Sequence, residues 1–149
     1  MIIDCHTHIN NYQNEEVESL AESLEKLQHE MRRNRIDIAI VLTSYKATPG
    51  RPSTRDAVQA TRDLKNVYIV AGISYMNYRE DELDEIREYL RDGSVRGLKL
   101  YPGYEPFFPF DAKLRKVYEL AEEFGVPVMI HSGDTYDPMG RLKYAHPLH

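Results

Sequence analysis

Five short apolar runs alternate with four amphipathic helical patterns, and this alternation constrains the fold more than any other feature of the chain. The runs are rich in Val and Ile and almost continuously apolar, which is typical of strands buried on both faces of a parallel sheet. We therefore predict a β-α-β-α-β-α-β-α-β order and a parallel sheet with right-handed crossovers. The predicted strands cover residues 2–5, 36–43, 67–74, 95–100 and 126–131.

The helical patterns carry their own start and stop signals. Small polar residues that can accept a backbone N–H precede them, and glycines that can take a left-handed conformation follow two of them. The first pattern repeats apolar residues at helical spacing from Val17 to Met31. The expected N-caps are Asn14, Ser53 or Thr54, and Asp111, and the expected C-terminal glycines are Gly93 and Gly125.

Composition narrows the class of protein. A chain of 149 residues with 42% hydrophobic and 29% charged residues fits a single globular domain spanning residues 1–149. The net charge is −5 and no basic block is present, so we expect no nucleic-acid partner. No apolar run approaches the ~18–20 residues of a membrane span. Cys5 is the lone cysteine, and no secretory leader precedes the first strand, so we expect a cytoplasmic protein.

The loops that follow the predicted strands are long and chemically rich, which places a site at the carboxyl ends of the strands. His6 and His8 end the first strand in the run Asp4-Cys5-His6-Thr7-His8. Because alternate strand residues share a face, both imidazoles and the Asp4 carboxylate should point the same way. Such a pair can bind one divalent metal ion. The alternative is two solvent-facing or hydrogen-bonded histidines.

His131 ends the fifth predicted strand and is a candidate third metal ligand. Three protein ligands leave a position for water, as in catalytic zinc sites; Mn or Fe are the alternatives to Zn. The other interpretation is a capping or core histidine that bonds to a loop carbonyl.

Two cationic residues are candidates for binding a small anionic substrate. Lys99 lies inside the fourth predicted strand and needs a polar partner there. That partner is an ion-paired acid such as Asp4, the substrate, or, after carbamylation, a pair of metals. Arg51 lies in the loop after the second strand. Aromatic residues in the same loops form either a substrate wall or ordinary packing: Tyr45, Tyr104, Phe107, Phe108 and Phe110.

Three motifs resemble the amidohydrolase superfamily. Residues 3–8, 97–102 and 126–133 are similar to its first, fourth and fifth strands, closest to the amidohydrolase-related group that includes aminocarboxymuconate-semialdehyde decarboxylase. The resemblance implies a (β/α)8 TIM barrel with a divalent metal at the carboxyl ends of its strands. His6 and His8 match the paired first-strand ligands, and His131 matches the fifth-strand ligand. The implied activity is metal-dependent hydrolysis or a related non-oxidative decarboxylation, a lyase reaction.

The resemblance stops after the fifth strand. The family also uses a histidine from the sixth strand and an acid–base aspartate from the eighth, and this sequence has neither. We therefore expect a partial barrel comprising strands 1–5 and helices 1–4, the N-terminal part of a longer enzyme. No catalytic residue is assigned, because this chain alone lacks the acid–base group. The alternative is a catalytically incompetent fragment or a non-enzymatic metal-binding scaffold.

The rival fold is a flavodoxin-like open sheet with strand order 2-1-3-4-5. That order separates the first and fifth strands by roughly 14 Å, which strains a shared metal site. A partial barrel in turn leaves two open sheet edges. It should therefore form a homo-oligomer or associate with the missing barrel half.

Overall fold

The computed structural model describes residues 1–11 and 18–148. Within them, five strands and four α-helices alternate in the predicted order. Short 3-10 turns at Ala112–Leu114 and Leu142–Tyr144 complete the secondary structure of these residues. The elements are β1 (Ile3–Thr7), α1 (Leu20–Arg33), β2 (Ile38–Leu42), α2 (Thr54–Thr61), β3 (Val67–Ile73), α3 (Glu80–Asp92), β4 (Val95–Leu100), α4 (Arg115–Phe124) and β5 (Val128–Ile130).

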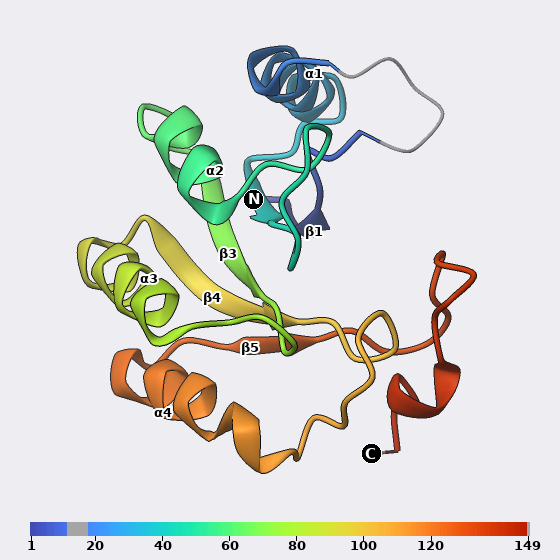
Figure 1. Cartoon of the computed structure of the whole chain (residues 1–149). Coiled ribbons are helices and arrows are strands. Elements are labelled where there is room, and N and C mark those ends of the chain that lie inside the picture. The colour runs from blue at the N-terminus through green and yellow to red at the C-terminus, as the bar shows by residue number, and fades with distance from the viewer. Residues whose placement is uncertain (12–17, 149) are drawn as a thin grey trace.

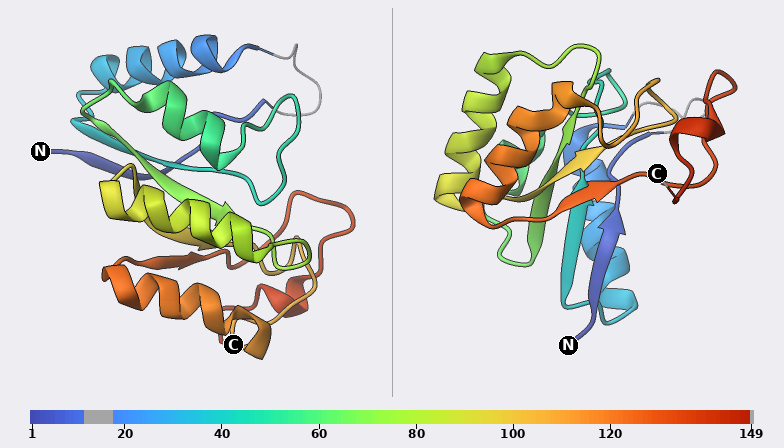
Figure 2. Two further views of the ribbon diagram at one scale, coloured as in Figure 1. Left: turned by 60° about the vertical axis from the view of Figure 1, so that its left-hand side comes forward. Right: turned by 90° about the horizontal axis from the view of Figure 1, so that it is seen from below.

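The strands form one sheet in the order β1-β2-β3-β4-β5, and every neighbouring pair is parallel. The four described helices lie on one face of this twisted, curved sheet (Figures 1 and 2). A flavodoxin-like sheet would put β1 in the interior and helices on both faces, so that alternative is wrong. The expected partial barrel is confirmed, with β1 and β5 as its two edges.

The core lies between the helices and the outer face of the sheet. Side chains of the central strands, such as Val41, Ile69 and Leu98, join one buried cluster with the apolar stripes of the helices. The two edge strands are less buried than the central ones: Ile3 of β1 is 46% exposed and Ile130 of β5 is 41% exposed. The prediction that both faces of every strand are buried is therefore wrong for β1 and β5, because neither has a strand beyond it.

The helix boundaries follow the predicted chemistry with one change. α1 begins after Ser19, whose hydroxyl accepts the Glu22 N–H while the Glu22 carboxylate accepts the Ser19 N–H. The expected cap Asn14 lies outside the described residues. The other expected boundaries are confirmed: Ser53 caps α2, Asp111 caps the 3-10 turn before α4, and Gly93 and Gly125 end α3 and α4 at φ of 80° and 62°.

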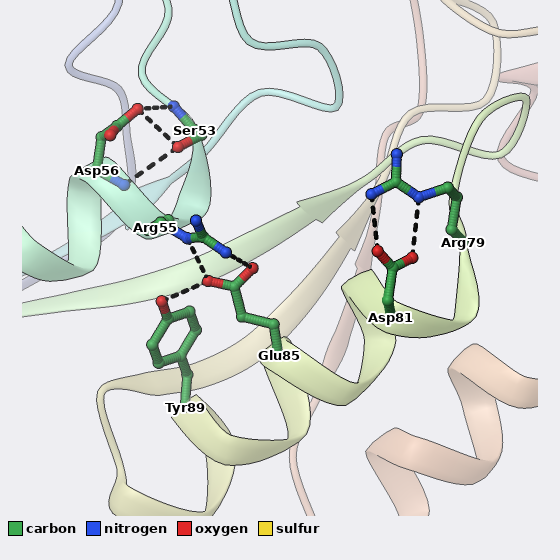
Figure 3. A network of polar contacts seen from close by, with 7 residues as sticks. All are labelled: Ser53, Arg55, Asp56, Arg79, Asp81, Glu85 and Tyr89. Atoms are coloured by element: carbon green, nitrogen blue, oxygen red, sulfur yellow. Dashed lines mark hydrogen bonds and ion pairs between the residues drawn. The ribbon is translucent and has the colours of Figure 1, made fainter.

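Charged side chains connect the helices on their outer surface (Figure 3). Arg55 of α2 donates from Nε and a terminal guanidinium nitrogen to the two carboxylate oxygens of Glu85 in α3, at 2.7 and 2.8 Å. Tyr89 donates its hydroxyl to the same carboxylate at 2.6 Å. Exposed pairs of this kind add little to the free energy of unfolding. These contacts link α2 to α3 on the outer surface of the helical layer.

Within the described ranges, no helix combines the length and apolar character needed to cross a membrane.

Candidate functional site

A tyrosine cluster lies where the loops after β2 and β4 meet. It consists of Tyr45, Tyr101 and Tyr104, with ring centroids 5.1 Å apart for Tyr45–Tyr101 and 6.2 Å apart for Tyr101–Tyr104. Tyr104 also meets the His131 ring, edge to face, at 4.9 Å. The cluster therefore adjoins a predicted metal ligand. Phe107, by contrast, is buried and stacks on Tyr75 at 4.4 Å, so it is ordinary packing.

His6 and His8 lie side by side at the end of β1, with ring centroids 5.2 Å apart. The His8 Nδ1 atom is 2.9 Å from the Leu42 carbonyl oxygen. Because a carbonyl only accepts, Nδ1 carries the proton and Nε2 keeps its lone pair. Backbone carbonyls orient metal-binding histidines in this way.

Asp4 does not follow the simple alternation. The register of β1 on β2 shifts between Asp4 and Thr7, which interrupts the pattern that places Asp4 beneath both imidazoles. The Asp4 carboxylate instead accepts the backbone N–H of His6 at 3.1 Å. Asp4 therefore contacts the backbone of His6 and not its imidazole.

His131 has a partner of its own. Its Nε2 lies 3.0 Å from the Asp134 carbonyl oxygen, the loop-carbonyl contact that the sequence left open as an alternative. Among the described residues, no three His, Cys, Asp or Glu side chains form a group that could hold a metal ion. The paired His6 and His8 suit metal binding, but a full ligand set is not assembled. The assignment of His131 as third ligand stays a prediction.

The three imidazoles share one electrostatic environment. Burial is the largest cause that lowers the pKa of His6, His8 and His131, and the positive charge of Lys99 lowers all three further. His6 also lowers the pKa of His8 and of His131. These surroundings therefore favour the neutral form of all three rings, the form that a metal ion requires.

Lys99 is 2% exposed, and burial lowers its pKa to about 8. Its ammonium lies 5.4 Å from the centroid of the Tyr101 ring. No ion pair joins Lys99 to an acid in the part of the chain that the structure describes, so the alternative of an ion pair with Asp4 or another acid is not observed there. A buried cation beside neutral histidines is suited to an anion from outside the chain.

Arg51 is half-buried in the loop after β2. Burial raises the pKa of the Tyr45 and Tyr101 hydroxyls, and the positive charge of Arg51 opposes the shift in both. Arg51 is thus close enough to Tyr45 and Tyr101 for its charge to act on both hydroxyls. Residues 1–11 and 18–148 offer it no ion-paired carboxylate.

Glu105 is the site residue that the sequence analysis missed. Its side chain is 4% exposed, and its carboxylate accepts three hydrogen bonds from the loop after β3. The available signal was a single acid inside an aromatic and proline-rich loop, Tyr101 to Phe110.

The fold and the position of these residues define a half-barrel of the TIM type with its polar groups at the carboxyl ends of the strands. The sequence model of the family described as Amidohydrolase matches residues 3–149. The chain therefore belongs to the amidohydrolase family. Among curated proteins, none matches the chain.

Solved structures share the fold. A probable 2-pyrone-4,6-dicarboxylic acid hydrolase from Acinetobacter baumannii, with citric acid bound, superposes with a TM-score of 0.60 at 11% identity. The match covers 88% of this chain and 49% of that one. An uncharacterised TIM-barrel protein from Bordetella bronchiseptica gives 0.61 at 23% identity, over 85% of this chain and 45% of that one. The chain thus spans about half the length of these two structures.

Proposed function

We propose that this chain belongs to a metal-dependent hydrolase that acts on a small carboxylate-bearing molecule. The observation that carries the proposal is the pair of cations without an acidic partner among the described residues, Lys99 and Arg51, beside three neutral histidines. A bound divalent ion, zinc first and manganese or iron as alternatives, supplies Lewis acidity in such enzymes. His6, His8 and His131 are the residues that would hold it.

The roles of the other residues follow from their positions. Lys99 and Arg51 bind and orient the substrate carboxylate, and the tyrosine cluster shields it from water. The Acinetobacter baumannii protein is described as a probable hydrolase of a dicarboxylic acid and holds citric acid, so polycarboxylates are the first candidates. Non-oxidative decarboxylation would use the same cations, and release of carbon dioxide distinguishes it from hydrolysis.

A substrate screen tests the proposal. Dicarboxylate lactones, esters and amides are incubated with the chain after loading with Zn²⁺, Mn²⁺ or Fe²⁺. We expect turnover or saturable binding that Arg51→Ala weakens by 10-fold or more, since a charge-assisted hydrogen bond contributes about 1.5–3 kcal/mol. Arg62→Ala, which removes an arginine at the end of α2, is the matched control. Equal affinity in wild type and Arg51→Ala would remove the anionic-substrate assignment.

The second candidate is a metal-binding scaffold without catalysis. The observation that favours it is the hydrogen bond that occupies His131, which leaves only His6 and His8 side by side. Stoichiometric metal without turnover supports the scaffold, and turnover by the chain alone rejects it. A cytoplasmic location is part of the same proposal, supported by the single cysteine of the sequence.

A further inference from the structure

A buried carboxylate joins two of the loops at the carboxyl end of the sheet. Glu105, in the loop after β4, accepts the Ser74 hydroxyl at 2.7 Å and the backbone N–H groups of Tyr75 and Met76 at 2.7 and 3.1 Å. These three donors all belong to the loop after β3. With 4% of the side chain exposed, water does not compete for these bonds.

The donor pattern matches the ionised form of the side chain. Both carboxylate oxygens face donors, and the Ser74 Oγ is itself held by the Asn77 N–H at 3.1 Å, so its own hydrogen points at Glu105. An amide at this position would place its NH₂ group against one of these donors. Glutamine is therefore isosteric with Glu105 but cannot reproduce its bonds.

The same residue organises the turn that carries Tyr104. The Glu105 N–H donates to the Tyr101 carbonyl at 3.0 Å, and the Gly103 N–H donates to the Glu105 carbonyl at 3.0 Å. Gly103 has a φ of 93°, and a Cβ there would lie 2.8 Å from the Ala145 Cβ, so the turn is closely packed. Tyr104 thus lies between Gly103 and Glu105, whose backbone N–H groups are both hydrogen-bonded within the turn.

Tyr104 in turn contacts the loop after β5. Its ring meets the His131 ring at 4.9 Å, and its hydroxyl accepts the Tyr136 N–H at 3.1 Å. A continuous series of contacts therefore runs from the loop after β3, through Glu105 and Tyr104, to His131.

We propose that Glu105 is a positioning residue, whose buried carboxylate anchors the loop after β4 and thereby holds Tyr104 against His131. The proposal rests on the proposed function only for the role of His131. Because the Glu105 carboxylate accepts its hydrogen bonds from Ser74, Tyr75 and Met76, it acts through Tyr104.

The test measures the His131 ring directly, without metal or substrate. In NMR spectra of the full chain, the Cε1–H resonance of His131, assigned by its loss in His131→Gln, carries a ring-current shift from Tyr104. Tyr104→Leu gives the position of this resonance without that shift. We expect Glu105→Gln to move the resonance most of the way from the wild-type position to the Tyr104→Leu position. Glu85→Gln is the matched control, since Glu85 also accepts three hydrogen bonds but lies on the outer surface of α3.

The alternative outcomes are distinct. A lower melting temperature in Glu105→Gln with the His131 resonance at its wild-type position would show a structural role alone and overturn the proposal. If Glu105→Gln does not fold, Ser74→Ala removes one donor, and an unmoved resonance in that folded variant overturns the proposal equally. Because no turnover is measured, failure here leaves the proposed hydrolase standing, and absence of turnover leaves the positioning role standing.

Discussion

At the scale of single residues, Lys99 is the side chain whose chemistry is most changed by its surroundings. Its pKa falls from 10.5 to about 8 in the folded chain, so the folded state holds this proton less tightly than the unfolded state does. The buried ammonium therefore destabilises the folded state. This destabilisation is fully present below about pH 8 and disappears as the pH rises toward 10.5. The difference between the two pKa values corresponds to a loss of at most about 3 kcal/mol in the free energy of unfolding.

Replacing Lys99 with methionine should therefore stabilise the apo-protein. Lys99→Met keeps an apolar stem of similar length and removes the buried charge. We expect the free energy of unfolding at pH 7 to rise by up to about 3 kcal/mol, and the gain over wild type to shrink between pH 8 and 10.5. Urea unfolding at a series of pH values measures both, and Lys65→Met is the surface control. Destabilisation at pH 7 would mean that Lys99 has a partner in the fold.

The residue scale also shows what a sequence can and cannot predict about a site. The sequence singles out His6, His8 and His131 because they end predicted strands and because the spacing of His6 and His8 along one strand is simple geometry. Their role as metal ligands stays a prediction. The register shift after Asp4 and the buried Glu105 were not foreseen, and the bond from His131 to a loop carbonyl was one of two interpretations that the sequence left open. Each depends on how loops fold back on the sheet, which no periodicity in the sequence encodes.

At the scale of elements, the central strands were predicted best. β4 occupies the predicted residues 95–100, whereas β5 shortens from 126–131 to Val128–Ile130. β4 has a neighbour on each side, but β5 pairs only with β4, so its ends lack the hydrogen bonds that extend a strand. The start of α1 lies at Leu20 because Ser19 and Glu22 form a capping box, which the Asn14 assignment overlooked.

The capping box of α2 allows a measurement at this scale. Ser53 accepts the Asp56 N–H at 3.1 Å, and the Asp56 carboxylate accepts the Ser53 N–H at 3.2 Å (Figure 3). Ser53→Ala should lower the free energy of unfolding by about 1 kcal/mol, because it leaves backbone donors of the first turn without a partner. Denaturant unfolding checks this, with Gln59→Ala on the exposed side of α2 as control. Equal losses in the two variants would argue against the capping role.

At the scale of the whole molecule, the sheet has two edges that no described strand covers. β1 and β5 each expose unpaired backbone groups, and apolar side chains such as Ile3 and Ile130 are 46% and 41% exposed beside them. All four described helices lie on one face of the sheet and cover neither edge (Figure 2). Such edges favour pairing with further strands.

We therefore predict that the 149-residue chain self-associates, or binds the strands that complete a barrel, instead of remaining a monomer. Size-exclusion chromatography with light scattering measures this directly. Ile130→Lys, which places a charge at the β5 edge, should shift the distribution toward smaller species. A monodisperse 17.4 kDa monomer with a cooperative thermal transition would contradict the prediction.

The central proposal is that His6, His8 and His131 of this chain bind one metal ion. Elemental analysis and zinc titration of the purified chain, after dialysis against a weak chelator, test it most directly. The account predicts stoichiometric zinc, manganese or iron, and losses in His6→Ala, His8→Ala and His131→Ala but not in His29→Ala, which changes a histidine within α1. Metal-free protein that does not bind Zn²⁺, or binding that survives all three substitutions, would contradict it.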